Sequence, residues 1–236
     1  MPLSYCARLV RDHDYNRYLC TLFTPAHNRE AWFTLFAFNH EIAVIGETVS
    51  EEMVGFVRFA WWRDALDKIY ATQLAPKHPV AEALARVIYA YRLPRGPFDI
   101  LLAARTQDVQ QEQFATFADL TAYCRETSGA LLRLCAIAAN LPVSPALDDL
   151  GIAWALIGMA RAQSQTDGIS TAELINAARQ HLETARTEKK GTMKSFAAFI
   201  HTCEFYLQRL TRNKEYKSRP TERLKLIVTL SLRSLI

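Results

Sequence analysis

The sequence predicts an all-α fold, built as a single-domain helical bundle of residues 1–236. Apolar residues recur at three- and four-residue steps along most of the chain, which is the spacing of a helix face turned toward a core. No stretch alternates apolar and polar residues around an Asn-Gly or Gly-Gly turn, as a β-hairpin would. With 236 residues, 50% hydrophobic and 22% charged, the chain is long enough for one large core and too apolar for general disorder.

The clearest helical pattern lies in residues 32–70. One face of its first half is an apolar stripe of Ala31, Leu35, Phe38, Ile42 and Ile45. A neighbouring face mixes polar and small side chains, as the wall of a pocket would: Phe36, Asn39, His40, Ala43 and Glu47. We expect Ser50 to cap a second long helix, because Glu51 and Glu52 follow it and acids favour the first turn.

The remaining apolar stripes predict further helices along the chain. They cover residues 3–11, 15–23, 78–91, 97–111, 116–140, about 145–162 and 172–185, with another stripe at 196–210. Pro25 ends the helix of 15–23, because the residue before a proline disfavours the helical conformation. Pro79 begins the helix of 78–91 and Pro94 follows its end, as prolines commonly do.

Small residues occupy one face of the helix predicted at 145–162. Gly151, Ala155, Gly158 and Ala162 follow one another at steps of four, three and four residues. A face with so little side-chain bulk either packs closely against another helix or borders a cavity. The spacing leaves both interpretations open.

Composition and charge narrow the cellular setting. The formal charge of +4 is modest and does not by itself indicate nucleic-acid binding. Five cysteines without a Cys-x-x-Cys pair, and no secretory apolar region, predict a reducing compartment and buried thiols. No run reaches the roughly 18 apolar residues of a membrane span. Asp12 and Asp14 argue against a transit peptide, so we expect a bacterial cytoplasmic chain, although a mature chain of the mitochondrial matrix would look the same.

Several segments resemble the squalene/phytoene synthase family, the all-helical head-to-head prenyl synthases. The likeness begins with FAFNHEIA and FVRFAWWRDALDKIY and continues through HPVAEALARVI, LPRGPFDILLAARTQD, FADLTAYCRETSGALLRLCA and LGIAWALIGMARA. In combination these motifs are specific to the family and cover most of residues 5–162. They are most similar to the branch that includes the mitochondrial complex I assembly factor with a phytoene-synthase-like domain, and the part from about residue 170 is divergent.

The resemblance implies a metal chemistry with which this chain can be compared. Active members present aspartates about four residues apart on each of two helices, and these carboxylates bind the Mg²⁺ ions that bridge to the substrate diphosphate. At the first motif the family pattern falls on Ala43, Val44 and Glu47, of which only Glu47 is acidic. At the second motif Ala162 and Thr166 stand at the aspartate positions.

The second motif has also lost its other polar residues. Ala155 and Gly158 stand where the family has Gln and Asn, and Arg161 alone remains of the polar run. The segment TDGIST is shorter than the loop that the resemblance would place over the diphosphate. Because one Glu cannot hold a cluster of divalent ions, the resemblance implies a chain with no cofactor and no Mg²⁺-dependent prenyl transfer.

Other acids could replace the lost ligands. Two pairs have one-turn spacing: Asp64 with Asp67, and Asp108 with Glu112. The alternative is that these carboxylates lie on solvated helix faces or pair with arginines. The candidate arginine partners are Arg58, Arg63 and Arg105.

An apolar pocket could survive the loss of the metal sites. Its candidate lining residues are Phe36, Asn39, Ala43, Tyr123, Gly129, Ala136, Ala155, Gly158 and Met159. An isoprenoid or acyl chain would fit such a pocket, unless side chains have filled it. The resemblance favours the cavity interpretation of the small-residue face at 145–162.

Two further stretches are candidates for contact surfaces. Trp61 and Trp62 point about 100° apart on a helix, so one can be a core residue while the other lies at the rim or in a partner site. Basic residues gather near the C-terminus: Lys189, Lys190, Lys194, Arg209, Arg212, Lys214, Lys217, Arg219, Arg223 and Lys225. With the apolar segment 224–236 they could contact an anionic membrane surface, or they could form a solvated basic face. No recognised nucleic-acid module accompanies them.

Two hypotheses follow from the sequence. In the first, the chain is a non-catalytic relative of the prenyl synthases that acts by binding a protein partner or a lipid, which the resemblance associates with complex I assembly at the inner membrane. In the second, it is an active prenyl transferase that joins isoprenoid diphosphates head to head and uses displaced Mg²⁺ ligands.

Overall fold

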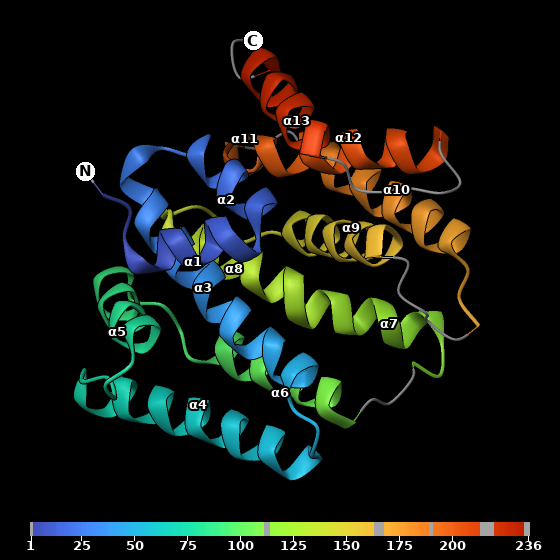
Figure 1. The fold of residues 1–236 in the computed structure, drawn as a ribbon. Coiled ribbons are helices and arrows are strands. Elements are labelled where there is room, and N and C mark those ends of the chain that lie inside the picture. The colour runs from blue at the N-terminus through green and yellow to red at the C-terminus, as the bar shows by residue number, and fades with distance from the viewer. Residues whose placement is uncertain (1, 111–113, 163–167, 189–190, 213–219, 234–236) are drawn as a thin grey trace.

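A computed structural model describes residues 2–110, 114–162, 168–188, 191–212 and 220–233 of the chain, and all its regular elements in these ranges are helices (Figure 1). The predicted all-α class is therefore confirmed. No described helix is long and apolar enough to cross a bilayer.

The N-terminal half holds the helices that the apolar stripes predicted. They are α1 (Tyr5–His13), α2 (Tyr15–Leu22), α3 (Ala26–Thr48), α4 (Glu52–Thr72), α5 (Pro79–Tyr91) and α6 (Gly96–Gln110). The prediction that Ser50 caps α4 is wrong. The backbone of Glu51 is extended, with φ −119° and ψ 126°, so the helix begins one residue later and has no side-chain cap.

The helix predicted at 116–140 is a continuous run with a π-helical turn in its middle. It consists of α7 (Phe117–Cys124), the π turn η1 (Arg125–Gly129) and α8 (Ala130–Ala138). Thr116 and Asp119 form a reciprocal capping box at its start. Within η1, Thr127 donates its hydroxyl hydrogen to the carbonyl of Tyr123 at 2.7 Å. Single π turns of this kind are frequent at functional sites.

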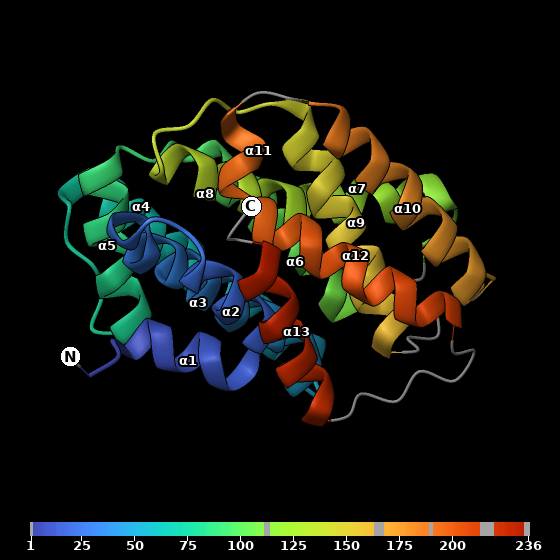
Figure 2. The same cartoon turned by 90° about the horizontal axis from the view of Figure 1, so that it is seen from above.

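The C-terminal half adds a second group of helices. They are α9 (Pro145–Ala162), α10 (Thr171–Thr187), α11 (Gly191–Ser195), α12 (Ala197–Arg212) and α13 (Pro220–Arg233). Helix α10 packs along α9, and α12 lies across α9 and beside α10 (Figure 2). Helix α13 lies over α12 at one end of the molecule, held by the buried side chains of Leu226 and Leu230 (Figure 1).

Helix α3 is the centre of the fold. Every residue from Ala31 to Asn39 is buried, and α3 packs against α1, α2, α4, α5, α6 and α8. The indole nitrogen of Trp32 donates to the carbonyl of Cys135 on α8 at 2.9 Å, and its ring stacks on Phe196 at 4.9 Å. The face predicted to resemble a pocket wall has two kinds of neighbour, since the Phe36 ring lies 6.0 Å from that of Phe199 on α12, whereas His40 stacks on His13 of α1.

Two expectations about burial are confirmed. All five cysteines are free and buried, and burial raises the pKa of the Cys20 thiol to about 12, which keeps that thiol protonated and unreactive. The tryptophan pair divides between core and surface, since Trp62 is 4% exposed and Trp61 is 39% exposed.

Candidate functional site

The first degenerate metal motif lies on the C-terminal half of α3. Ala43 and Val44 are half-buried hydrocarbon side chains, so neither can bind a cation. Glu47 is exposed, one residue before the helix ends at Thr48. This part of α3 therefore offers one solvated carboxylate from the motif.

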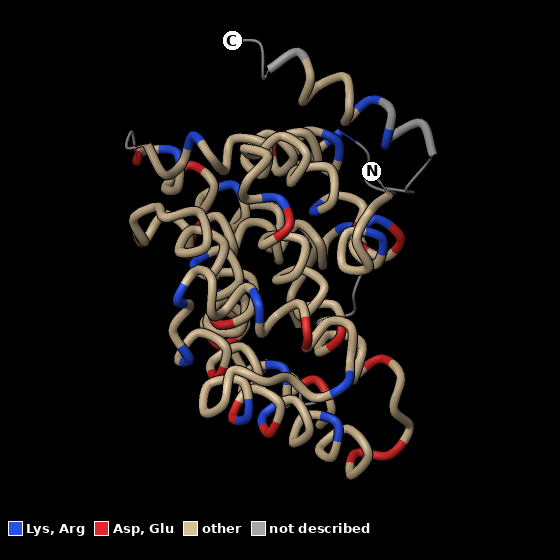
Figure 3. Tube along the Cα trace, turned by 90° about the vertical axis from the view of Figure 1, so that its left-hand side faces the viewer, with Lys and Arg blue, Asp and Glu red and all other residues tan. Residues whose placement is uncertain are grey.

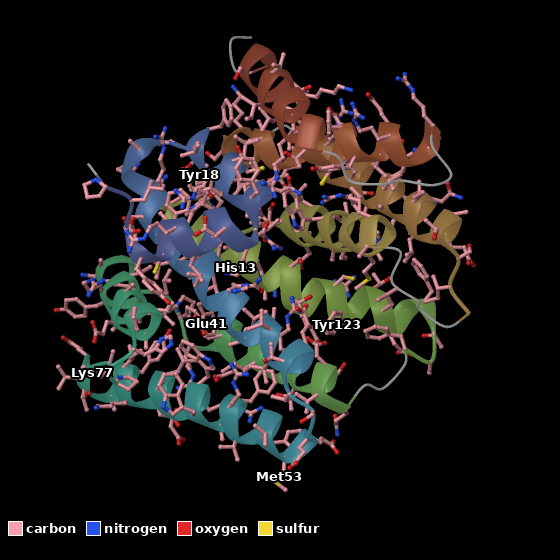
Figure 4. All side chains as sticks on the ribbon, in the orientation of Figure 1. His13, Tyr18, Glu41, Met53, Lys77 and Tyr123 are labelled. Atoms are coloured by element: carbon pink, nitrogen blue, oxygen red, sulfur yellow. The ribbon has the colours of Figure 1, made fainter. Side chains whose placement is uncertain are left out.

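The neighbouring acid Asp108 is already paired. Its carboxylate accepts a hydrogen bond from the Tyr123 hydroxyl at 2.6 Å and one from the Arg105 guanidinium at 3.1 Å, and Arg105 also donates to the Tyr123 oxygen at 2.7 Å. Figure 4 shows Tyr123 on the side of α7 that faces α3 and α6. Asp108 also lies close to α3, since a Cβ atom added to Gly46 of α3 would lie 2.8 Å from the Cβ of Asp108. For Asp108 the structure therefore shows one of the alternatives expected from the sequence, pairing with an arginine.

The other candidate acids do not converge on the motif. Asp67 pairs with Arg95 at 2.6 Å, instead of the arginines expected from the sequence, and Asp64 is exposed on α4. Glu112 lies outside the described residues. Within the described ranges, no three His, Cys, Asp or Glu side chains are placed to hold a metal ion together.

The second degenerate motif ends α9. Ala162 is exposed at the last position of the helix, and Thr166 lies outside the described residues. Arg161, the remaining polar residue of the motif, lies with its guanidinium 3.9 Å from the centre of the Tyr206 ring on α12. Its Nε is buried without a hydrogen-bond partner among the described residues.

The small-residue face of α9 serves both purposes that the sequence left open. At Gly151 it is a close packing contact, since an added Cβ would lie 2.4 Å from the backbone nitrogen of Gly129 in η1. At Gly158 an added Cβ would meet nothing within 4 Å. The face therefore packs against η1 at one end and borders free space at the other.

A small cavity of about 30 Å³ lies beside Gly158, between α2, α9 and α12. Its lining residues are Asn16, Trp154, Ile157, Gly158, Arg161, Thr202, Cys203 and Tyr206. The Tyr206 hydroxyl donates to the Asn16 side chain at 3.0 Å, which closes one wall. A cavity of this size has room for a water molecule or two, and its charged group is Arg161.

A buried guanidinium joins this cavity to the predicted pocket wall. Arg17 on α2 donates to Asp14 at 2.6 Å and to Ser128 of η1 at 3.4 Å. Its charge lies 5.7 Å from the ring centre of Phe36 and 5.3 Å from that of Trp154, distances at which cation–π attraction operates. Its Nε has no partner among the described residues. Sequence reasoning missed Arg17, for which the spacing of Asp14 and Arg17 was the one local signal.

The other predicted lining residues are distributed around this region. Asn39 is buried, and its Oδ1 makes no hydrogen bond within the described part of the chain. Ala136 is completely buried, while Ala155 and Met159 are half-buried on α9. Gly158 is the predicted residue that lines the small cavity, and retention of a larger ligand pocket stays a prediction.

Two histidines stack where α1 meets α3. The rings of His13 and His40 lie 4.4 Å apart between centroids and 20° from parallel. Figure 4 shows His13 in the middle of the view, beside α3, and its side chain is exposed. Burial lowers the pKa of His40, and the adjacent His13 lowers it further. The stack is therefore most stable when His40 is neutral.

Comparison with known proteins identifies the family. The family model described as squalene/phytoene synthase matches residues 10–168. The chain belongs to the squalene/phytoene synthase family. This confirms the resemblance drawn from the motifs.

Within the squalene/phytoene synthase family, the chain is similar to relatives with two kinds of name. It is 33% identical over 130 residues to "NADH dehydrogenase (ubiquinone) complex I, assembly factor 6" of Bos taurus, and 32% identical over 130 residues to the protein of that name from Homo sapiens. The match covers 55% of this chain and 39% of each relative, so the chain spans about two fifths of their length. It is 22% identical over 126 residues to "15-cis-phytoene synthase" of Synechococcus elongatus, covering 53% of this chain and 40% of that enzyme.

Solved structures support the fold. A squalene synthase from Alicyclobacillus acidocaldarius superposes with a TM-score of 0.73 at 18% identity, covering 88% of this chain and 92% of the enzyme. A dehydrosqualene synthase in complex with a ligand superposes with a TM-score of 0.71 at 16% identity, covering 98% and 96% of the two chains. At such low identity these similarities establish the isoprenoid synthase fold alone.

Proposed function

We propose that this chain is a non-catalytic member of the squalene/phytoene synthase family that acts by binding a protein partner during assembly of respiratory complex I, at the inner membrane. The observation that carries the proposal is the chemistry of the two motif positions. Ala43 and Val44 have taken the place of acids on α3, and Ala162 has done so on α9. Head-to-head prenyl transfer needs divalent ions to neutralise the leaving diphosphate, and hydrocarbon side chains cannot bind them.

The polar groups near the first motif support the same conclusion. Asp108 lies against α3 in this region, and its two oxygens are bonded to Arg105 and Tyr123. Recruiting this carboxylate to a metal would compete with both bonds and weaken the pairing of the Arg105 guanidinium with its acid. Of the positions matched to the two motifs, Glu47 alone is acidic, which is too few ligands for a magnesium cluster.

The names of the relatives indicate the process. Relatives that share about a third of their aligned residues with this chain are named assembly factors of complex I, whereas the phytoene synthase is 22% identical. The proposed partner is accordingly a complex I subunit or assembly intermediate. An isoprenoid or other lipid bound in the pocket region is a further candidate ligand.

A deletion strain tests this proposal. Loss of the gene should lower the amount of assembled NADH:quinone oxidoreductase, measured by native gel and by NADH-dependent quinone reduction, and leave succinate dehydrogenase unchanged. Re-expression of the chain should restore the complex, and the Glu47→Gln variant should restore it equally, because the last acid of the motif has no catalytic task. A normal complex I level in the deletion strain would contradict the proposal.

The competing function is prenyl transfer with displaced ligands. Purified chain incubated with farnesyl or geranylgeranyl diphosphate and Mg²⁺ should release no diphosphate above the protein-free rate, with an active phytoene synthase as positive control. Steady diphosphate release would reject the non-catalytic assignment.

A further inference from the structure

Residues of α12 and α13 line a groove between the two helices. Figure 1 shows α13 at one end of the molecule. The groove has a volume of about 600 Å³ and is lined by Phe205, Gln208, Arg209, Arg212, Lys225, Val228 and Thr229. Three of these seven side chains are cationic and none is acidic. The groove therefore presents positive charge beside apolar surface.

The cations come from two different helices. Arg209 and Arg212 lie in the last turn of α12, where the helix dipole favours positive charge. The dipole of α12 does not account for the position of Lys225, which lies within α13. Figure 3 shows basic residues on the described part of α13, which lies at the periphery of the molecule. The convergence of the three charges thus comes from the packing of α13 on α12.

The groove also holds its charges in a defined arrangement. The Arg209 guanidinium lies over the Phe205 ring, 4.6 Å from its centre, where cation–π attraction holds it at the groove wall. Arg212 and Lys225 are exposed and can reach outward. Val228 lies on the same side of α13 and is 50% exposed, while Leu226 and Leu230 anchor the other side. An exposed apolar side chain beside several Lys and Arg side chains is typical of a protein surface that enters a membrane interface.

We infer that this groove binds the phosphate headgroups of anionic phospholipids and thereby docks the α12–α13 end of the chain on the membrane. This inference rests on the membrane location in the proposed function, and it names the lipid headgroup that the chain would bind there. Charge complementarity identifies the occupant, because phosphate oxygens accept bidentate hydrogen bonds from arginine while the neighbouring acyl region can take up Val228. The neighbouring charged residues Lys214, Glu215, Lys217 and Arg219 lie outside the described residues.

Vesicle binding of the purified full chain tests this inference. Vesicles of phosphatidylcholine mixed in equal parts with phosphatidylglycerol should bind the protein, and vesicles of phosphatidylcholine alone should not. The double variant Arg212→Gln/Lys225→Gln should bind about 30-fold more weakly, because each basic residue near an anionic surface contributes about fivefold. A circular dichroism melt of the variant checks that its fold is intact.

The matched control is Lys68→Gln/Lys77→Gln. These two lysines are exposed and carry the same total charge, and Figure 4 shows Lys77 at the opposite end of the molecule from α13. The control should bind the mixed vesicles as the unmodified chain does. Equal loss in both double variants would show a general charge effect and overturn the site, as would binding to phosphatidylcholine alone.

Competition identifies the source of the phosphate. Inorganic phosphate at the concentration of the lipid phosphate should leave vesicle binding unchanged, because a single free anion lacks the apolar contact. Full displacement by phosphate, or tighter binding to single-stranded RNA than to vesicles, would reject a membrane headgroup as the occupant. Failure of vesicle binding with normal complex I restoration would refute this inference alone, whereas the deletion experiment judges the proposed function separately.

Discussion

Tyr123 donates its hydroxyl hydrogen to Asp108 over 2.6 Å, and this bond ties α7 to α6 beside the C-terminal half of α3. Burial raises the pKa of Tyr123 far above its usual value, so the hydroxyl stays protonated as the donor. In a prenyl synthase this region would have to offer free carboxylates to magnesium. Here the carboxylate is occupied by a phenol and a guanidinium.

Removal of that hydroxyl should destabilise the fold. We expect Tyr123→Phe to lower the free energy of unfolding by about 2 kcal/mol, because a hydrogen bond to a charged acceptor is lost and Asp108 keeps only Arg105. Urea denaturation followed by circular dichroism measures the change. Tyr89→Phe is the matched control, since Tyr89 is 65% exposed and should change stability little. Equal stability of both variants would show that the bond has no net value.

The two glycines of α9 should respond in opposite directions. Gly151→Ala should destabilise the protein by about 3 kcal/mol, because the new methyl group would overlap the backbone of η1 and neither helix can yield cheaply. Gly158→Ala should stabilise it by about 0.5–1 kcal/mol, because alanine is the better helix former and the site is open. Thermal melts of the two variants give both signs. Similar effects at the two positions would contradict the assignment of one contact and one open site.

The histidine stack predicts a loss of stability in mild acid. Because the pKa of His40 is lowered in the folded state, the unfolded chain binds its proton first, near the usual pKa of 6.5. The contribution of His40 is complete above that value and is lost as the pH falls through its folded pKa. The melting temperature should therefore decrease between about pH 7.5 and about pH 5.5, and His40→Gln should flatten that decrease. The control His27→Gln, at an exposed histidine, should have the same dependence of melting temperature on pH as the unmodified chain.

Magnesium should not stabilise the folded chain. A ligand that binds the native state and not the unfolded state raises the melting temperature as its concentration rises. A magnesium cluster would therefore give a higher melting temperature in millimolar Mg²⁺ than in chelator. We expect the melting temperature to be the same in both conditions, with and without added farnesyl diphosphate. A rise of several degrees that needs Mg²⁺ and the diphosphate together would point to functional ligands outside the two motifs.

Local sequence pattern was sufficient for the helices and the family. The bounds predicted for the helix at 145–162 agree with α9, and proline positions marked the ends of α2 and α5, because helix propensity and side-chain periodicity act over a few residues. The start of α4 was the exception. Its cap depends on backbone angles at Glu51 that the favourable residue type of Ser50 did not reveal.

The candidate site divides in the same way. The sequence by itself determined that the positions matched to the metal motifs by resemblance carry alanine, valine and threonine, because residue identity decides which side chains can bind a metal. Only the tertiary structure decided that Gly151 is a packing contact while Gly158 borders a cavity, since the two differ in what another segment brings opposite them. It also decided the surroundings of Arg17, whose partner Ser128 is 111 residues away. Long-range packing creates such neighbours, and no local pattern in the chain encodes them.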